Sequence, residues 1–425
     1  MTPEANARAE LLQLIDSKMN RTLKYYLDTC VRCAICKDAC HQYVATGDVL
    51  YLPAYRAELI RRIYKKYMTG SGRLLPKLFE GRDPEDDVLL DELYKTTYAC
   101  TSCRRCMFWC PFSIDTSWVL AVAKALLLAT GRGSEILTQL ADSAIDKGKN
   151  IDLYTGVIRE VLKGSEEEMR RIVQDPSAGF VYDKQGADVL YVALAGTHTI
   201  LPAAIVFHQA GEDWTLSSFE GSNYGYFLGD TVKAKAIAQR IVDEAKTLGV
   251  KEIVMSECGH AHRVMRDFYR MWAKEELPAP MVSILSKVDG YIKDGRIKVT
   301  PGKITEPVTY HDPCQIGRNF GLFEEPRNVV RATCSDFRDM TPNRQKQWCC
   351  GGGGGLVAET EFDDVRLKSG RLKADQIKAT GAKILVTPCE NCRLQIESLN
   401  DHYDLGVRVS AVLDLVVEAI EIKPR

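Results

Sequence analysis

The chain has 425 residues, of which 45% are hydrophobic and 27% charged, and its formal net charge at pH 7 is −1. A chain of this length can form two or three domains with cores of their own, and its near-neutral charge gives no reason to expect a nucleic acid as partner. The opening residues, MTPEANARAELLQLIDSK, lack the basic and apolar segments of a signal peptide, so we expect none.

Cysteine usage gives the strongest signal in the composition. The chain has 15 cysteines, and thirteen of them fall into tight clusters. Secreted disulfide scaffolds are short chains, whereas closely spaced cysteines in a long chain without a signal peptide favour metal binding. We therefore expect a reducing compartment and predict a cytoplasmic protein, which a partner subunit could hold at the inner face of a membrane.

Two cysteine runs in the first third of the chain have the spacing of ferredoxins. The first reads CVRCAICKDAC from Cys30 to Cys40, and the second reads CTSCRRCMFWCP from Cys100 to Pro111. In such runs three cysteines hold one cubane 4Fe-4S cluster, and the fourth reaches the other cluster. The expected ligand sets are Cys30, Cys33, Cys36 and Cys110 for one cubane, and Cys100, Cys103, Cys106 and Cys40 for the other.

A pair of zinc sites is the alternative for these runs. Zinc needs only two C-x2-C pairs, and it gives no reason for the third cysteine or for the x3 step. The first run departs from the second in one respect, because His41 rather than a proline follows its last cysteine. This difference could change the packing around that cluster.

The 59 residues between the runs carry apolar residues at helical spacing, as in YRAELIRRIYKKYM. This arrangement resembles the helical two-cluster ferredoxin module of respiratory iron–sulfur subunits, and we assign residues 1–135 to it. Seven basic residues and the single acid Glu58 lie between Arg56 and Lys77. They predict a solvated face or, as the alternative, a docking face for an anionic partner. Residues 136–184 are predicted to form a helical connector.

From residue 185 onward, apolar strands alternate with helices. The segments DVLYVAL, KAKAIAQRIVDEAKTLG and KEIVMSEC are echoed by PVTYHDPC, RLKADQIKATG and AKILVTPCENC. This pattern predicts two doubly wound α/β lobes, residues 185–303 and 304–425. The expected fold class is therefore α+β multidomain, a helical ferredoxin module followed by two α/β lobes. The uncharged stretch from Val189 to Gly211 is predicted to be a strand, a turn and the start of a buried helix, so we expect no transmembrane segment.

Five cysteines of the second lobe follow strands or precede helices: Cys314, Cys349, Cys350, Cys389 and Cys392. Strand ends of an open parallel sheet meet at one crevice, and helix N-termini there favour thiolates. Five thiolates are one more than a cubane uses, which suits a larger or less symmetric cluster. The run from Gly351 to Gly355 permits positive φ and close approach of the chain.

Three alternatives compete for the glycine run and its cysteines. A phosphate-binding loop would need a Lys-Ser/Thr pair, which does not follow the glycines. A flexible linker would not lie inside a strand–helix pattern. A zinc site could use four of the five cysteines.

The pattern Cys-x34-Cys-Cys-Gly-x37-Cys-x2-Cys resembles the CCG cysteine-rich domain of the heterodisulfide reductase family. Together with the two ferredoxin runs, it resembles the D-type catalytic subunit of that family and related iron–sulfur subunits of sulfate-reducer membrane redox complexes. The resemblance covers nearly the whole chain. It implies that the same five cysteines hold a noncubane 4Fe-4S cluster that binds and reductively cleaves a disulfide.

The first lobe departs from this pattern. Thr197 stands where a cysteine would follow the strand, Ser218 and Phe219 replace the cysteine pair, and Ala261 replaces the second cysteine of the C-x2-C motif. We therefore expect no second five-cysteine cluster. A lone cysteine such as the remaining Cys258 is most often an inert buried residue. As the functional alternative, Cys258 is the first catalytic candidate, a thiol facing the third cluster, or else a further ligand of that cluster.

His311, in HDPC, is the second catalytic candidate, because a histidine could give a proton to a leaving thiolate. His260 and His262 could act in the same way, and a structural histidine is the alternative for each of the three. Cys334 has no partner in the sequence pattern and is predicted to be inert.

These observations predict an iron–sulfur oxidoreductase subunit of an anaerobic redox complex. Electrons would pass through two cubanes to the noncubane cluster, which reduces or reversibly forms a disulfide-type substrate. The expected partners are a membrane cytochrome of the b type, a flavoprotein or further iron–sulfur proteins. The alternative is an electron-transfer subunit without a substrate of its own, serving a membrane cytochrome, a flavoprotein or an aromatic-ring-reducing complex. A zinc-stabilised scaffold is a third hypothesis.

Overall fold

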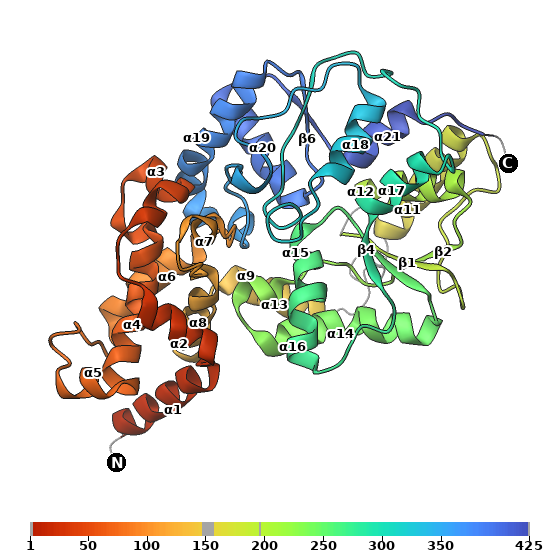
Figure 1. Ribbon diagram of the computed structural model, residues 1–425. Coiled ribbons are helices and arrows are strands. Elements are labelled where there is room, and N and C mark those ends of the chain that lie inside the picture. The colour runs from red at the N-terminus through yellow and green to blue at the C-terminus, as the bar shows by residue number, and fades with distance from the viewer. Residues whose placement is uncertain (1–2, 147–156, 195–196, 424–425) are drawn as a thin grey trace. The chain divides into compact units, whose positions relative to one another are not determined.

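The computed structural model describes residues 3–146, 157–194 and 197–423, which form a mixed helical and sheet structure (Figure 1). By their internal contacts the residues divide into two compact units. The first unit contains Met1–Gln139, Phe227–Asp230 and Trp348–Lys373, and the second contains Leu140–Tyr226, Thr231–Gln347 and Ala374–Arg425. Across the described ranges, no helix is both long enough and apolar enough to cross a membrane.

The first unit is built from helices. They are α1 (Pro3–Lys18), α2 (Arg21–Thr29), η1 (Ile35–Ala39), α3 (His41–Thr46), η2 (Val49–Tyr51), α4 (Pro53–Met68), α5 (Gly70–Leu74), α6 (Asp87–Tyr98), α7 (Arg105–Trp109), α8 (Thr116–Ala129) and the start of α9 (Glu135–Asp146). Pro53 stands at the first position of α4, where its fixed φ suits a helix start. Asp86 and Asp115 accept backbone hydrogen bonds at the starts of α6 and α8.

The basic run of α4 does not form a simple solvated face. Arg56 is only 2% exposed, and its guanidinium donates to Gln42 Oε1 at 2.6 Å and to Thr96 Oγ1 at 3.1 Å. Four further bases form ion pairs within the unit: Arg61 with Glu58, Arg62 with Glu80, Lys65 with Asp28, and Lys66 with Asp83. Most of these charges are therefore neutralised inside the unit, which weakens the alternative of a docking face.

The second unit contains two parallel sheets. The first has the order β2-β1-β3-β4, formed by β1 (Val189–Val192), β2 (Trp214–Leu216), β3 (Glu252–Met255) and β4 (Met281–Ser283). The second has the order β5-β6-β7, formed by β5 (Val308–Tyr310), β6 (Ile384–Val386) and β7 (Arg408–Ser410). Leu190 is paired with Ile253 in the first sheet, and Thr309 with Leu385 in the second.

Helices surround these strands (Figure 1). They are α11 (Val157–Val173), α12 (Thr197–Ala210), the start of α13 (Tyr224–Leu228), α14 (Thr231–Leu248), α15 (Gly259–Arg263), η3 (Val264–Phe268), α16 (Tyr269–Ala273), α17 (Ile284–Lys293), α18 (Glu324–Thr333), η4 (Arg344–Lys346), the end of α19 (Asp363–Thr380), α20 (Glu390–Tyr403) and α21 (Val412–Ala419). The first unit contains η5 (Leu356–Ala358), η6 (Thr360–Phe362) and the start of α19. The uncharged stretch from Val189 to Gly211 thus contains β1 and α12, as predicted; its residues 195–196 lie outside the described residues.

The core of the second unit follows the alternation of side chains along β1. Val189 and Tyr191 belong to one buried apolar cluster, and Leu190 and Val192 belong to another, because successive strand residues point to opposite faces. The first cluster also contains residues of α12, α17, α21, β5 and β6, so both sheets share one core. The second cluster contains residues of α14 and α15. This shared core fixes the strand ends of the two sheets within one unit.

Candidate metal centres

The cysteines of the ferredoxin runs line two separate cavities of the first unit. Cys30, Cys33, Cys36 and Cys110 line one cavity, together with Pro53, Ala57 and Cys106. Cys40, Cys100, Cys103 and Cys106 line the other, together with His41, Gln42 and Arg56. Each expected ligand set therefore gathers at a cavity of its own. Each set has the four thiols that a 4Fe-4S cubane takes, and Cys106 lines both cavities. The role of these cysteines as iron ligands stays a prediction.

The two runs share an uncommon backbone conformation. Arg32 and Ala34 in the first run have φ of 56° and 59°, and Ser102 and Arg104 in the second have φ of 53° and 60°. Residues other than glycine rarely adopt positive φ, because the Cβ atom crowds the backbone. Its recurrence at matching positions indicates a functional constraint. The left-handed residues turn the chain sharply between cysteines, so that three successive thiols line one cavity.

Charge and burial differ from one thiol to another. Burial raises the pKa of the Cys36 thiol to about 11. Burial also raises the pKa of the Cys40 thiol, and the positive charge of Arg56 opposes this rise. The buried guanidinium of Arg56 thus offsets part of the negative charge that four thiolates would place in the second cavity. Sequence reasoning missed this role, because it took the basic run of α4 as a surface feature.

The cysteine pair Cys349–Cys350 belongs to the first unit, with the whole segment Trp348–Lys373. The guanidinium carbon of Arg105 lies 3.5 Å from the centre of the Trp348 ring and 4.1 Å from that of Trp109. Cys349 Sγ lies 3.5 Å from Thr101 Oγ1. The segment therefore packs directly on the second ferredoxin run.

The glycine run makes this packing possible. A Cβ atom on Gly353 would lie 2.8 Å from Thr101 O, and one on Gly354 would lie 2.4 Å from Cys100 O. Gly351, Gly354 and Gly355 also have positive φ. The glycine run thus shows both the positive φ and the close approach of the chain that the sequence predicts. The close approach is to the backbone of the second ferredoxin run, a contact that no feature of the sequence pattern predicts.

The other three cysteines of the CCG pattern belong to the second unit, and all three are buried. Cys314 follows β5, and Gln347 Nε2 donates a hydrogen bond to its sulfur at 3.1 Å. Cys389 is the N-cap of α20, and Cys392 lies in the first turn of that helix. The convergence of all five cysteines on one cluster stays a prediction.

His311 and its loop are held by a buried ion-pair network. A ring nitrogen of His311 lies within 4.8 Å of Cys392 Sγ. The neighbouring Asp312 receives two hydrogen bonds of 2.7 Å from Arg327, whose side chain is fully buried and also pairs with Asp339. Paired charges at this depth fix the geometry of the HDPC loop, because removing either partner would leave an uncompensated buried charge.

Cys258 lies at the N-cap of α15, buried, with its sulfur 3.0 Å from His260 Nδ1. Burial raises the pKa of the Cys258 thiol well above its usual range, so the thiol is neutral at pH 7. Burial lowers the pKa of His260 to about 3 and that of His262 to about 4. His262 Nε2 also lies 3.1 Å from Ser256 O. These two histidines are neutral at pH 7, which favours their structural alternative.

Four positions of residues 185–303 have other residues where the cysteine pattern of residues 304–425 has cysteines. Thr197 begins α12. The Ser218 backbone N–H donates to Glu244 Oε1 at 2.8 Å, and the Arg240 guanidinium lies over the Phe219 ring at 4.9 Å. Ala261 is 1% exposed. Cys334 is 7% exposed and belongs to the apolar core, and its inert role stays a prediction.

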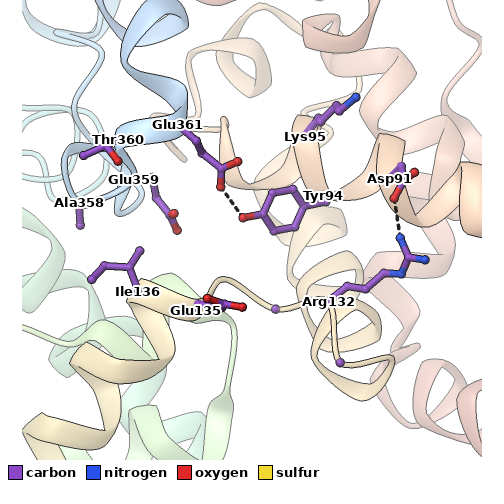
Figure 2. A pocket seen from close by; sticks show the side chains of 12 residues that line it. Asp91, Tyr94, Lys95, Arg132, Glu135, Ile136, Ala358, Glu359, Thr360 and Glu361 are labelled. Atoms are coloured by element: carbon purple, nitrogen blue, oxygen red, sulfur yellow. Dashed lines mark hydrogen bonds and ion pairs between the residues drawn. The ribbon is translucent and has the colours of Figure 1, made fainter.

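A further cavity of about 830 Å³ in the first unit has no cysteine in its lining (Figure 2). Its walls come from α6, from residues 131–136 and from residues 358–361. The Tyr94 hydroxyl donates to Glu361, and Arg132 pairs with Asp91. Burial raises the pKa of the Glu359 carboxyl on this wall. Sequence reasoning missed the cavity, because residues 358–361 are far along the chain from its other two lining segments.

Comparison with known proteins agrees with the two cysteine-rich regions. The 4Fe-4S dicluster domain family matches residues 26–114, and the cysteine-rich CCG domain family matches residues 308–397. The chain is 30% identical, over 94% of its length, to the Hdr-like menaquinol oxidoreductase iron–sulfur subunit of Archaeoglobus profundus, of which 80% is covered. It is 27% identical, over 93% of its length, to the D-type subunit of the dihydromethanophenazine:CoB–CoM heterodisulfide reductase of Methanosarcina barkeri, of which 94% is covered.

More distant similarity extends to quinone-linked proteins. The chain is 23% identical, over 87% of its length, to the EtfAB:quinone oxidoreductase of Syntrophomonas wolfei, of which 54% is covered. The relationship predicted from the cysteine patterns is confirmed by these matches, and so is an oxidoreductase that carries iron–sulfur clusters. This chain belongs to the family of iron–sulfur oxidoreductase subunits that includes the Hdr-like menaquinol oxidoreductase iron–sulfur subunits and the D-type subunits of heterodisulfide reductase.

Proposed function

We propose that the chain carries electrons through two cubane 4Fe-4S clusters to a noncubane 4Fe-4S cluster, where a disulfide-type substrate is reduced or reversibly formed. The cubanes are assigned to the two ferredoxin sets, and the noncubane cluster to Cys314, Cys349, Cys350, Cys389 and Cys392. Reduction breaks the S–S bond, takes up two electrons and two protons, and yields two thiols. When bound, the clusters supply storage and transfer of single electrons.

One observation carries the order of this electron path. The sulfur of Cys349 lies within 4.8 Å of the sulfur of Cys103, inside the first unit. Cys103 is assigned to the second cubane and Cys349 to the noncubane cluster. Adjacent ligands of two clusters leave only a short gap for the electron to cross, so the second cubane is the direct donor to the noncubane cluster.

We assign four parts to the chain: the ferredoxin module 1–135, the connector 136–184, and two doubly wound CCG-type lobes, 185–303 and 304–425. The parallel order of both sheets supports the two lobes, and so does the presence of apolar clusters on both faces of β1. The strand β3 leads into α15 through Cys258, and β6 leads into α20 through Cys389, which supports a common ancestry of the lobes.

We assign catalytic roles to Cys258 and His311. His311 lies within 4.8 Å of the Cys392 sulfur, so it is placed to give a proton to a departing thiolate beside that cysteine. Cys258 is a buried neutral thiol, and Coulomb interaction with Cys389 contributes to its raised pKa, which supports a position near the same cysteine. His311 would act as the proton donor, and Cys258 as a thiol facing the substrate.

A second candidate is an electron-transfer subunit without a substrate of its own. The loss of cysteines at Thr197 and Ala261 favours it, because the first lobe then adds no second noncubane cluster. In either case we propose that the partners are other redox subunits: a membrane cytochrome of the b type, a flavoprotein or further iron–sulfur proteins. The relatives named as subunits of oxidoreductases support a multi-subunit complex. Such a partner would place the chain at the inner, cytoplasmic face of the membrane.

The test is a metal and sulfide analysis of anaerobically purified protein. Three four-iron clusters require about twelve irons per chain, and the double variant Cys349→Ala, Cys350→Ala is expected to hold about eight. The matched control is Cys334→Ala, which removes a buried cysteine outside every assigned set and should keep about twelve. About eight irons and one zinc in the unmodified protein would contradict the noncubane cluster.

Substrate probes separate the two candidate functions. Cystine and glutathione disulfide are added to reduced protein, and the electron paramagnetic resonance spectrum of the third cluster is recorded. A changed spectrum, absent in the double variant, supports disulfide chemistry. An unchanged spectrum in protein that still passes electrons to an artificial acceptor supports the electron-transfer subunit.

A further inference from the structure

His41 is a buried residue of the ferredoxin module, and the hydrogen bonds described for this module do not involve its ring nitrogens. It is the first residue of α3 and is 2% exposed. Within the part of the chain that the structure describes, neither of its ring nitrogens has a hydrogen-bond partner. A neutral imidazole carries one donor and one acceptor, and leaving such a group buried and unpaired costs about 1–3 kcal/mol. In the second run Pro111 occupies the corresponding position, so the ferredoxin motif itself does not require a histidine.

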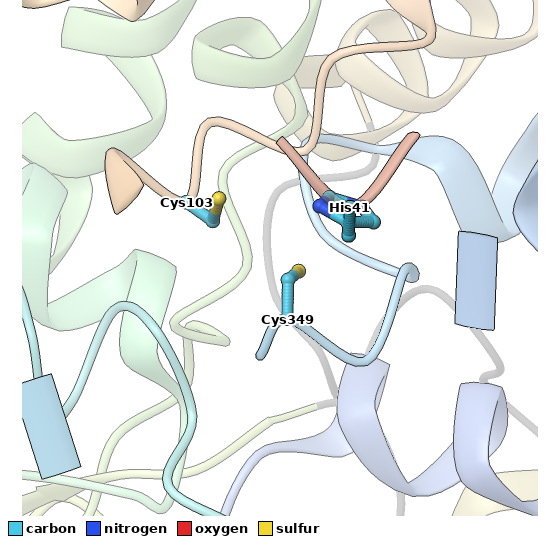
Figure 3. A group of neighbouring side chains, drawn as sticks. All are labelled: His41, Cys103 and Cys349. Carbon is cyan, nitrogen blue, oxygen red and sulfur yellow. The ribbon is translucent and has the colours of Figure 1, made fainter. Parts of the chain in front are cut away.

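The His41 ring faces two sulfurs (Figure 3). One of its nitrogens and the Sγ atoms of Cys103 and Cys349 lie within 4.8 Å of one another, and all three residues are buried. His41 is also among the residues that line the second cavity, whereas the lining of the first cavity does not include it. The imidazole therefore stands where the assigned ligands of the second cubane and of the noncubane cluster meet.

We propose that, when the second cubane is bound, the N–H group of His41 donates a hydrogen bond to the Cys103 sulfur, beside Cys349, and so raises the reduction potential of that cubane. The inference rests on the proposed function, because it requires both cysteines to bind iron. Thiolate sulfurs accept hydrogen bonds, and the unpaired N–H is a donor that complements them. Such bonds favour the reduced cluster, which carries more negative charge, and they are among the factors that set cluster potentials.

Iron ligation is the competing role for the imidazole, since histidine replaces cysteine in some iron–sulfur centres. The second cavity already offers four thiols, the full set for a cubane, so the geometry favours a hydrogen bond. His41 is thus a positioning residue that links two clusters and tunes the first of them.

The chain offers a fold-compatible variant for the test. Proline is favoured at the first position of a helix, and the preceding Cys40 has the extended backbone that proline requires of its neighbour. His41→Pro therefore removes the imidazole and reproduces the residue of the second run. His41→Asn keeps an N–H donor at the same place. His402→Ala, which changes an exposed histidine, is the matched control.

The measurement is a potentiometric titration of the anaerobic full chain, followed by electron paramagnetic resonance. In His41→Pro we expect the ratio of reduced to oxidised second cubane, at fixed potential, to fall about tenfold, which corresponds to about 59 mV for a one-electron couple. The first cubane serves as an internal reference and should not shift. We expect His41→Asn to recover most of the change and His402→Ala to match the unmodified protein.

Three results would overturn the inference. An unchanged ratio of reduced to oxidised second cubane in His41→Pro would rule out the proposed hydrogen bond. Equal shifts of this ratio in the Pro and Asn variants would show that the volume of the ring, not its N–H group, causes the effect. A loss of about four irons in His41→Pro would make the imidazole an iron ligand. These failures leave the proposed function intact if the unmodified protein holds about twelve irons, whereas about eight would refute both.

Discussion

The turns that follow β3 and β6 have nearly the same backbone and carry different chemistry. Cys258 and Cys389 are both the third residue after their strand and the N-cap of the following helix. Their φ and ψ are −114° and 113° for Cys258, and −118° and 121° for Cys389. Three residues further on, the first lobe has the buried Ala261, and the second has Cys392.

Backbone hydrogen bonds of the sheet hold the start of each turn. The Ser256 backbone N–H donates to Val192 O at 3.0 Å in the first lobe, and the Thr387 N–H donates to Ser410 O at 3.0 Å in the second. These ladder bonds and the shared core hold both turns. If Cys389 and Cys392 bind iron as proposed, the bonds and the core explain how the first turn keeps the same backbone without the second thiol. The first turn has instead become a packing surface, where Gly259 lies against Gln315 and Ile316.

The sharpest test of this comparison exchanges the two N-cap cysteines for alanine, one at a time. We expect Cys389→Ala to lose the noncubane cluster, so that iron falls from about twelve to about eight per chain, with loss of any disulfide reduction. We expect Cys258→Ala to keep about twelve irons, because its lobe lacks the other ligands. Iron analysis of both variants decides, and equal losses would show that the two turns bind metal alike.

The residues that precede Cys258 and Cys389 predict that the two turns contribute differently to the pH dependence of the unfolding free energy. Glu257 is buried and accepts a hydrogen bond from the Leu413 backbone N–H at 3.2 Å, and its counterpart in the second lobe is Pro388. Burial, followed by the charge of Asp414, raises the pKa of Glu257 to about 8. Folding thus favours the protonated Glu257 carboxyl. The contribution of this carboxyl to stability is full below its pKa in the unfolded chain, and it is lost as the pH rises toward 8.

Glu257→Gln should remove this dependence. Between pH 5 and pH 8 we expect the unmodified protein to lose on the order of 3 kcal/mol of unfolding free energy relative to the variant. Denaturant unfolding at several pH values measures the difference. Glu397→Gln changes an exposed glutamate of α20 and should leave the pH profile as it is. Parallel profiles for Glu257→Gln and the unmodified protein would contradict the raised pKa.

A smaller loss of stability is expected when the residue after each of these two cysteines is changed to alanine. A Cβ atom on Gly259 would lie 2.5 Å from Gln315 Cβ and 3.0 Å from Ile316 N. Gly259→Ala should therefore destabilise the protein by about 1–3 kcal/mol through overpacking. At the equivalent place in the second lobe, Glu390→Ala loses two partly exposed pairs, with His198 and with Arg393, and we expect less than about 1 kcal/mol. Thermal unfolding of the two variants would rank them, and the opposite order would argue against the packing role.

The smallest expected effect comes from restoring the lost motif. Ala261→Cys recreates a C-x2-C sequence with Cys258, but Thr197, Ser218 and Phe219 still supply no thiols. We expect the iron content to stay at about twelve per chain. A gain of about four irons would mean that the first lobe needs fewer cysteines than the second to build a cluster.

The sequence alone determined the local chemistry of this protein. The x2 and x3 spacings predicted two cysteine sets, and those sets line two cavities. Short spacing explains the three cysteines that each set takes from one run, and the recurring motif explains the fourth, which comes from the other run. The alternation of strands and helices, the missing cysteines around Thr197 and the family of the chain were also accessible from the pattern of residues. Each of these features depends on residues that are close together in the chain or on a motif with fixed intervals.

Only the tertiary structure decided what distant segments do together. It placed Trp348–Lys373 in the same unit as the ferredoxin runs and brought Cys349 beside Cys103 and His41. It also turned Arg56 inward toward the thiols of the second cavity, and built a cavity of about 830 Å³ between α6 and residues 358–361. No spacing rule reaches such pairs, because contacts between distant segments depend on how whole elements pack, and packing is a property of the folded chain.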